Sequence, residues 1–171
     1  TLGQLYAWGD NTYKQIGDGT TVTLRSVPVQ IGSSSYSQIS TYGTHNLAID
    51  VNNKLYAWGE NTAGQVGISS YPYSWVAVYG TGPVFFAKKH DGTLWGWGYN
   101  GYGNLGDGTY NNTTVPVQAT SLSGVVTLDA GYYHSMYVKS DGTVWGCGAN
   151  WEGALGNGDT YDQTVPVKML N

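Results

Sequence analysis

Short runs in which apolar and polar residues alternate recur along the whole chain. Gln4–Ala7, Lys54–Ala57 and Thr143–Gly146 are such runs, each with β-branched, aliphatic or aromatic residues between smaller or polar ones. Further runs of this kind, Asn46–Ile49 and Ser135–Val138, lie upstream of the last two. A period of two over four to eight residues is typical of half-buried β-strands. The pattern therefore predicts a protein built from many short strands.

Tight turns separate neighbouring runs. Asp91-Gly92 and Asp141-Gly142 stand between two extended runs, and Asn52-Asn53 occupies the same place earlier in the chain. Asp-Gly is a strong hairpin signal because the two-residue turn needs a positive φ. The runs are therefore predicted to pair as antiparallel hairpins.

A ten-residue segment occurs four times without gaps. Every copy has glycine at its second position, asparagine at its fourth, and an aliphatic residue followed by glycine at its end: Trp8–Gly17, Trp58–Gly67, Trp97–Gly106 and Cys147–Gly156. Self-similarity at a period of about 40 to 50 residues indicates a repeat architecture. Each unit contains about four short antiparallel strands, which is the content of one β-propeller blade. We therefore predict an all-β fold of about three and a half four-stranded blades.

The repeats divide a single propeller-type domain, 1–171, into four parts. These are a half repeat at 1–30 and repeats at 31–72, 73–118 and 119–171. In the repeat 31–72 the Gly-Asp-Gly-Thr loop and the Val-Pro-Val run that follow the other segments are missing. We therefore expect this blade to lack its outer strand.

Ile68, Tyr71 and Tyr73 mark the edge that such a loss exposes. An unpaired strand edge offers free N–H and C=O groups to another chain, so these residues form a candidate docking edge. A truncated loop covered by the two tyrosines explains the same residues equally well. The third repeat has no histidine at the position of His45: alignment from upstream, with Tyr73 at the position of Tyr36, puts Gly82 there, and alignment from downstream puts Val84 there.

Composition narrows the possible functions. The chain has 26 Gly, 15 Tyr and 7 Trp, only 11% charged residues, and a formal net charge of −4. No basic stripe is present, which disfavours nucleic acid as a partner. The single cysteine permits no intramolecular disulfide. No apolar run approaches the ~20 residues of a membrane span.

No group of residues predicts catalysis. The lone Cys147 has no base at a recognisable spacing, and the three histidines lie in different repeats, which disfavours a zinc site. The glycine loops at Asp18, Asp107 and Asp159 are explained by turn chemistry without calcium. We expect no catalytic residue, no metal and no cofactor, and therefore a non-enzymatic protein.

Two sets of residues are candidates for other roles. Those that recur once per repeat are expected to be structural: Trp8, Asn11, His45, Trp58, Asn61, Trp97, Asn100, His134 and Asn150. Aromatic residues in the loops beyond the strands are candidates for partner or ligand contacts: Tyr13, Tyr99, Tyr102, Tyr110, Trp151 and Tyr161. Aromatic faces among short polar side chains suit sugars and proteins alike. Covering the seams between blades is an equally good explanation of these rings.

The motifs together resemble the regulator of chromosome condensation repeat family over nearly the whole chain. Its repeats combine a Gly-x-x-His strand start, as at Gly131–His134, with an Asp-Gly turn and a Trp-Gly-x-Asn segment that ends in Leu-Gly. The resemblance implies a propeller of seven repeats. Three and a half repeats cannot close such a ring. Partner chains, a longer polypeptide or an open array would resolve this, and two copies would supply seven repeats.

Low charge and abundant Tyr, Thr, Asn and Gly favour a structural or binding module of a virion or extracellular surface. Repeats with so few charges resemble those of bacterial exoproteins and phage structural proteins. In this hypothesis the protein assembles with copies of itself or with other structural subunits, and adheres through its loops and its exposed edge.

Two alternatives remain. One is a lectin-like module that binds surface glycans. The other is an intracellular, cytoplasmic propeller that promotes guanine-nucleotide exchange or acts as a scaffold, as members of the resembling family do.

Overall fold

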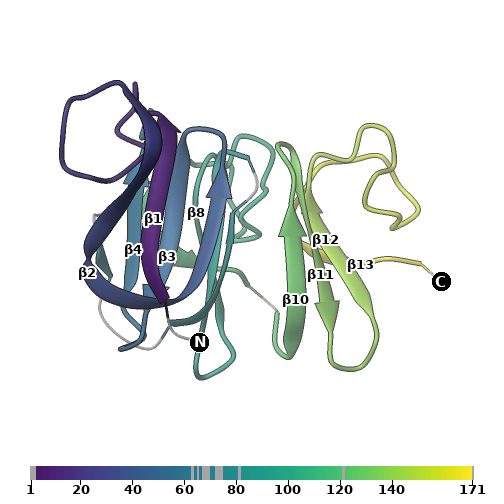
Figure 1. The fold of residues 1–171 in the computed structure, drawn as a ribbon. Helices are drawn as coiled ribbons and strands as arrows, with labels where there is room; N and C mark the ends of the chain where they lie inside the picture. The colour runs from purple at the N-terminus through teal and green to yellow at the C-terminus, as the bar shows by residue number, and fades with distance from the viewer. Residues whose placement is uncertain are drawn as a thin grey trace.

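The protein is described by a computed structural model, which covers residues 3–62, 64, 66, 70–71 (backbone only), 75–80, 82–120 and 122–170 (Figure 1). These residues form thirteen strands in antiparallel sheets, and no described residue is helical. The predicted all-β fold is therefore confirmed. Among the described residues no helix could cross a membrane.

The first sheet combines a half blade with a full blade through one long strand. Strand β1 (Gly3–Asp10) pairs with the first part of β2 (Leu24–Tyr42), and we call this pair blade 1. The second part of β2 pairs with β3 (His45–Asp50), which is followed by β4 (Leu55–Gly59) and β5 (Ser70–Tyr71). We call these four strands blade 2.

Two four-stranded meanders complete the fold. Blade 3 consists of β6 (Trp75–Gly80), β7 (Val84–Lys89), β8 (Leu94–Gly98) and β9 (Thr113–Gln118). Blade 4 consists of β10 (Val125–Ala130), β11 (His134–Lys139), β12 (Val144–Gly148) and β13 (Gln163–Lys168).

Each blade has two distinct ends. The turns between second and third strands lie at one end, which we call the hairpin end, and there Asn53, Gly92 and Gly142 have positive φ values of 61°, 83° and 80°. The turns between first and second strands and the long loops between third and fourth strands lie at the other end, which we call the loop end (top of Figure 1). The Asp-Gly and Asn-Asn sequences thus form the predicted hairpin turns.

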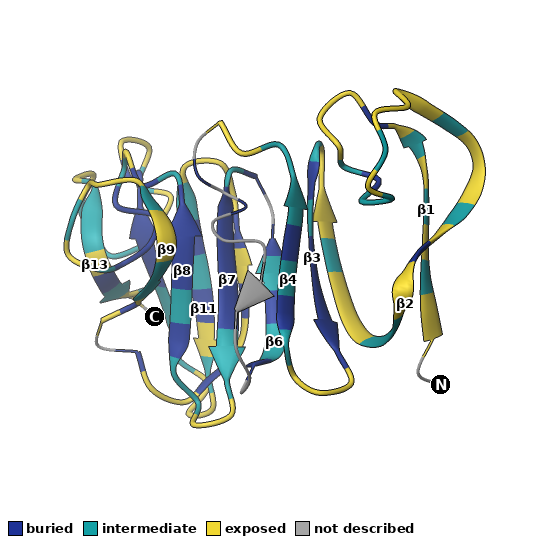
Figure 2. Cartoon of the chain, turned by 90° about the vertical axis from the view of Figure 1, so that its left-hand side faces the viewer, coloured by how far each residue is buried: buried dark blue, intermediate teal, exposed yellow. Residues whose placement is uncertain are grey.

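Apolar side chains pack between successive blades. Leu47 and Leu55 of blade 2 share one buried cluster with Phe85 and Trp97 of blade 3. A second buried cluster joins blade 3 to blade 4, with members such as Phe86, Leu105, Leu128, Tyr137 and Cys147. Burial is concentrated in the strands of blades 2 to 4, whereas blade 1 is largely exposed (Figure 2).

The strand register corrects the expected alignment of blade 3. Tyr36 pairs with Asp50 in blade 2 and Trp75 pairs with Lys89 in blade 3, so Trp75 rather than Tyr73 occupies the position of Tyr36. Val84 faces Gly98 just as His45 faces Gly59, so Val84, which the downstream alignment gives, occupies the histidine position and Gly82 does not. The pairing of β6 with β7 fixes this register. Trp75 is buried, as is its equivalent in blade 4, Val125, which pairs with Lys139.

The outer strand of blade 2 is present, so the expectation that this blade lacks it is wrong. Among the described residues, β5 pairs Tyr71 with Leu55 and Ser70 with Tyr56. Of the candidate docking edge, Ile68 and Tyr73 lie outside the described residues. For Tyr71 only the backbone is described.

Candidate functional site

The loop end is built on the repeated asparagine of each long loop. The Asn100 side-chain oxygen accepts a hydrogen bond from the N–H of Leu105 at 2.9 Å, and its amide nitrogen donates to the carbonyl of Thr109 at 3.1 Å. Asn11, Asn61 and Asn150 each accept the same bond, also at 2.9 Å, from the fifth residue that follows. A side-chain amide suits this position because it donates and accepts at once. The asparagines therefore stabilise the conformation of the loops.

At two of the described blade junctions, a backbone carbonyl of a long loop accepts hydrogen bonds from the next blade. The Gln15 carbonyl accepts hydrogen bonds from the Trp58 indole N–H at 2.9 Å and from the Asn46 amide at 2.6 Å. The equivalent carbonyl of Asn104 accepts from the Ser135 hydroxyl at 2.9 Å and from the Cys147 thiol at 3.2 Å. The thiol thus takes the place of the indole as a donor in the last blade.

The repeated histidine also joins neighbouring blades. The Nε2 of His45 donates to the carbonyl of Gly82 in blade 3 at 2.9 Å, and burial lowers the pKa of this ring. His134 occupies the same position in blade 4, but its ring makes no hydrogen bond with any described residue. It lines a pocket of about 110 Å³ beside Trp151 and Glu152.

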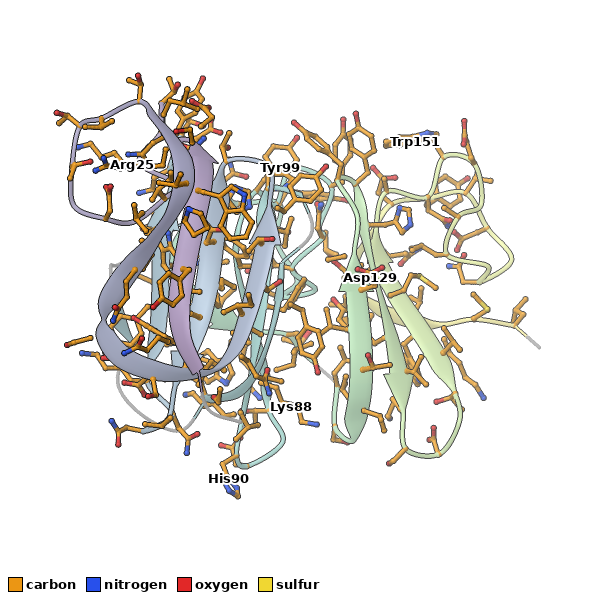
Figure 3. All side chains as sticks on the ribbon, viewed as in Figure 1. Arg25, Lys88, His90, Tyr99, Asp129 and Trp151 are labelled. Atoms are coloured by element: carbon orange, nitrogen blue, oxygen red, sulfur yellow. The ribbon has the colours of Figure 1, made fainter. Side chains whose placement is uncertain are left out.

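Five aromatic rings meet at the loop end of blades 3 and 4, and we call them the aromatic cluster: Tyr99, Tyr102, Tyr132, Tyr133 and Trp151. Tyr102 packs edge to face on Tyr133 and Trp151, with ring centroids 5.2 and 5.1 Å apart. The ring centroids of Tyr132 and Tyr133 lie 4.7 Å apart. Such geometries stabilise aromatic pairs beyond the area that they bury. Figure 3 shows Tyr99 and Trp151 above the ends of the strands.

The aromatic cluster contains three of the six predicted loop aromatics. Tyr132 and Tyr133, which sequence reasoning missed, come from the turn before His134, where the repeat motif Gly-x-x-His was the only signal. Both rings, together with that of Trp151, are exposed to solvent. Tyr13, Tyr110 and Tyr161 are exposed as well, but none of them makes a ring contact with another described residue.

The loop end as a whole carries more acidic than basic residues. The loop end carries two basic residues, Lys14 and Arg25, and seven acidic ones: Asp10, Asp18, Glu60, Asp107, Glu152, Asp159 and Asp162. Arg25 pairs with Asp18 at 2.6 Å. Hydrogen bonds from the Thr12 hydroxyl and the Thr44 hydroxyl lower the pKa values of Asp10 and Glu60, so both carboxyls are ionised at neutral pH.

Basic side chains gather at the opposite, hairpin end. Lys89 lies over the ring of Trp95 at 3.9 Å, and Lys54 and Lys139 lie over neighbouring aromatic rings at 5.0 and 5.1 Å. The two ends therefore differ in charge, with the negative excess at the loop end.

The buried thiol of Cys147 is unreactive at neutral pH. Burial raises the pKa of Cys147 to about 12, so the group stays protonated at neutral pH and is a poor nucleophile. Within the described residues no cluster of three or more His, Cys, Asp or Glu side chains could hold a metal ion.

Comparison with known families and sequences gives a consistent assignment. The family described as "Regulator of chromosome condensation (RCC1) repeat" matches residues 3–49, 91–138 and 141–171. A second description of the same repeat matches residues 36–65 and 125–153. No curated protein sequence matches the chain.

Solved structures support the same fold. Human WBSCR16 is 22% identical, with a TM-score of 0.82 over 99% of this chain and 49% of its own. Prp20p from Saccharomyces cerevisiae, described with its binding to Gsp1p and histones, is 21% identical, with a TM-score of 0.83 over 99% of this chain and 47% of its own. Yeast RCC1 (Prp20) bound to Kap60 is 22% identical, with a TM-score of 0.83 over 99% of this chain and 45% of its own.

This chain thus spans about half the length of the solved structures that it matches. The family match covers most of its residues, and the observed blades have the strand order that the repeat requires. The chain belongs to the regulator of chromosome condensation (RCC1) repeat family.

Proposed function

We propose that this chain is a non-enzymatic, protein-binding part of an intracellular scaffold propeller, and that its loop end binds a basic segment of a partner protein. The observation that carries the proposal is the aromatic cluster. Its rings come from two neighbouring blades, and the three exposed ones, Tyr132, Tyr133 and Trp151, come from blade 4. They lie at a loop end that carries seven acidic residues.

Aromatic residues suit this role. Tyr and Trp are enriched at protein interfaces and dominate the binding energy of many of them. The rings of Tyr102, Tyr133 and Trp151 already pack on one another in the free chain. Because their orientations are set in advance, these rings lose less side-chain entropy when a partner binds.

The charge of the loop end indicates the chemistry of the partner. Arginine and lysine are attracted to the faces of Trp and Tyr rings and to carboxylates. Seven acidic residues against two basic ones give this end a negative field that speeds the approach of a basic partner. A basic protein segment therefore fits the surface better than a neutral glycan does.

The solved relatives support a protein partner. Prp20p is described with its binding to Gsp1p and histones, and in a complex with Kap60. None of the three similar structures described above is a viral or extracellular structural protein. We therefore prefer the intracellular scaffold hypothesis over assembly on a virion or cell surface.

A peptide-binding assay tests the proposal. Fluorescently labelled peptides of alternating Arg-Gly, Glu-Gly and Ser-Gly are titrated with the full chain and followed by fluorescence anisotropy. We expect saturable, salt-sensitive binding of the Arg-Gly peptide only. Trp151→Ala should weaken it about tenfold or more, the loss seen at an interface hot spot.

Tyr161→Ala is the matched control, because Tyr161 is an exposed ring in the same loop but outside the aromatic cluster. Equal affinity for the three peptides, or an equal effect of the two substitutions, would refute the proposal. A glycan-array signal that disappears in Trp151→Ala would favour the lectin-like alternative instead.

A further inference from the structure

We propose that a pocket at the loop end, between blades 2, 3 and 4, binds the ammonium group of a lysine side chain in the partner protein. Glu60 supplies the opposite charge, and the rings of Tyr42 and Tyr132 contact the alkyl chain of the lysine. The inference deepens the proposed function and rests on it for the source of the ammonium group. The pocket adjoins the aromatic cluster through Tyr132, which belongs to both.

Three successive turns at the loop end enclose this pocket, which has a volume of about 220 Å³. They are the turns between the first and second strands of blades 2, 3 and 4, and they contribute Thr44, Pro83 and Tyr132. Glu60, which follows β4, completes the lining. A water molecule takes about 30 Å³, so the five non-hydrogen atoms at the end of a lysine side chain need roughly 150 Å³. They fit within the pocket.

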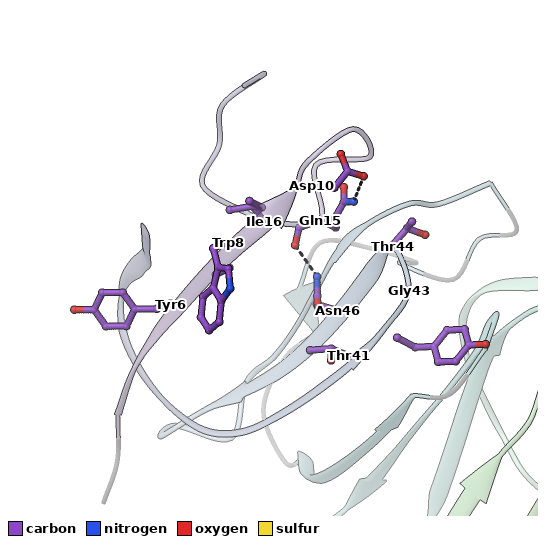
Figure 4. A pocket seen from close by; sticks show the side chains of 11 residues that line it. Tyr6, Trp8, Asp10, Gln15, Ile16, Thr41, Gly43, Thr44 and Asn46 are labelled. Atoms are coloured by element: carbon purple, nitrogen blue, oxygen red, sulfur yellow. Dashed lines mark hydrogen bonds between the residues drawn. The ribbon is translucent and has the colours of Figure 1, made fainter. Parts of the chain in front are cut away.

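The turn of blade 2 has a pocket on each side. Gly43 and Thr44 also line a larger pocket beside blade 1, where Figure 4 shows them. The smaller pocket differs because it lies between complete blades. Its walls are therefore held by the packing of one blade on the next.

Close packing of two turns places Tyr132 at the pocket. Gly82 has a φ of 82°, and a Cβ atom added to it would lie 3.3 Å from the Cα of Tyr132. Any side chain at this position would therefore crowd the turn of blade 4, and only glycine adopts this φ without strain. The rings of Tyr132 and Tyr42 are 54% and 47% exposed, so both are accessible to a ligand.

Glu60 gives the pocket its charge. The Thr44 hydroxyl donates a hydrogen bond to Oε2 of this carboxylate, and the Thr62 hydroxyl donates to Oε1 at 2.8 Å. These two bonds lower the pKa of Glu60, so the carboxyl is ionised at neutral pH. His45, which also lines the pocket, is neutral because burial lowers the pKa of its ring. The pocket therefore attracts a cation.

The fold of the repeat does not depend on a carboxylate at this position. The N–H of Glu60 donates to the carbonyl of Thr44 at 2.9 Å. Tyr99 in blade 3 and Ala149 in blade 4 make the same backbone bond, at 3.0 and 2.8 Å. Side chains as different as these serve the backbone equally well. The charge of Glu60 is thus free to act on a ligand.

His45 adds an unpaired acceptor beside the pocket. Its Nε2 donates to the Gly82 carbonyl, so its Nδ1 carries a lone pair in the neutral ring. The side chain is only 4% exposed, and Nδ1 has no hydrogen-bond partner among the described residues. A buried acceptor without a partner is destabilising. A positive charge bound in the pocket would offset part of this effect.

The hydrogen bonds of Glu60 favour lysine over arginine. Each of its oxygens already accepts one hydroxyl and has one lone pair left. A guanidinium binds a carboxylate best through two parallel bonds, whereas an ammonium is a compact charge that needs no fixed geometry. The faces of Tyr42 and Tyr132 add the attraction of aromatic rings for an ammonium group.

Titration of the full chain with n-butylammonium chloride at constant ionic strength, followed by amide chemical shifts, tests the pocket directly. We expect saturable shifts at Thr44, Glu60 and Thr62, and none with n-butanol, which lacks the charge. Glu60→Gln should abolish these shifts. Glu152→Gln should retain them, because it removes the same charge from the same end but outside the pocket. Absent shifts in the parent chain, or equal losses in the two variants, would overturn the proposal.

A second pair of variants guards against a folding defect in Glu60→Gln. Tyr42→Ala changes a ring that is 47% exposed and should weaken the binding of n-butylammonium. Tyr110→Ala changes a ring that is 55% exposed and lies outside the pocket, so it should leave the binding unchanged. Equal binding by these two variants would also overturn the proposal.

A pair of peptides separates this inference from the proposed function. The Arg-Gly peptide carries at its centre either lysine or the neutral acetyl-lysine. The lysine peptide should bind about five- to tenfold more tightly, as expected for one exposed ion pair with a cation–π contact, and Glu60→Gln should remove the difference.

Two outcomes distinguish the possible failures. Equal affinity of the two peptides, with the loss in Trp151→Ala retained, would overturn the lysine pocket and leave the proposed function standing. Binding of n-butylammonium without binding of either peptide would refute the proposed function, and with it lysine as the ligand.

Discussion

The role of the repeated asparagine can be tested by Asn100→Ala. Asn100 is completely buried, and its side chain bonds the N–H of Leu105 at 2.9 Å and the carbonyl of Thr109 at 3.1 Å. Alanine fills the same backbone position but can neither accept nor donate. The substitution therefore leaves the backbone N–H and C=O groups without these partners inside the loop.

The expected loss follows from those two groups. A buried polar group left without a partner costs about 1–3 kcal/mol, so the loss of partners for two such groups should lower the free energy of unfolding by about 2–6 kcal/mol. For a chain of this size each kcal/mol shifts the melting temperature by about 2–4 °C. The variant should therefore melt roughly 4–24 °C below the parent chain.

Urea denaturation followed by tryptophan fluorescence, together with calorimetry, measures this loss. Asn111→Ala is the matched control, because Asn111 is exposed in the same loop and its side chain makes no hydrogen bond with a described residue. A loss below about 1 kcal/mol in Asn100→Ala, no larger than that of the control, would refute the reasoning.

Three further results are expected. Iodoacetamide should leave Cys147 unmodified in the folded chain at mildly alkaline pH and should modify it in concentrated urea. The reason is that burial raises the pKa of this thiol to about 12. Rapid modification of the native chain would contradict this expectation. Trp58→Phe keeps an aromatic ring but removes the indole N–H that donates to the Gln15 carbonyl. The free energy of unfolding, measured by urea denaturation, should therefore fall by about 0.5–1.5 kcal/mol. An unchanged denaturation midpoint would show that this hydrogen bond does not contribute to stability. Hydrogen bonds from Thr93 and Thr143 lower the pKa values of Asp91 and Asp141 in the folded chain below 3.8. The stabilisation from these two carboxylates is therefore complete above pH 3.8 and is lost as the pH falls through their folded-state pKa values. Acid unfolding that begins near neutral pH would argue against this.

Some features of the site could be predicted only in part. The sequence identified Tyr99, Tyr102 and Trp151 as loop aromatics, but it gave no reason to group them with Tyr132 and Tyr133. Tyr99 and Tyr102 meet Tyr132 and Tyr133 because blade 4 packs beside blade 3 and brings a turn of one next to a loop of the other. Trp151 meets Tyr133 within blade 4, where a loop folds beside a turn that is distant in sequence. No local sequence pattern encodes contacts between residues so far apart in the chain.

The same limit explains the error in blade 3. Counting from Tyr73 gave an alignment two residues away from the observed one, because the short junction after blade 2 has no counterpart in the other repeats. Pairing with Lys89 and burial of the ring place Trp75 at the position of Tyr36. Register is a property of two strands together, so it became certain only when the partner strand was known.

Sequence alone determined the strand content, the hairpin turns, the repeat and the positions that carry its asparagines, because alternation and turn chemistry act between residues close together in the chain. Tertiary structure decided which rings meet at the loop end, and that Trp97 is buried while Trp8 is exposed. These two tryptophans stand in nearly the same local sequence, Trp-Gly followed by an asparagine two residues later. Their surroundings differ because a complete blade packs against one and only a half blade surrounds the other, and burial depends on neighbours that are distant in sequence.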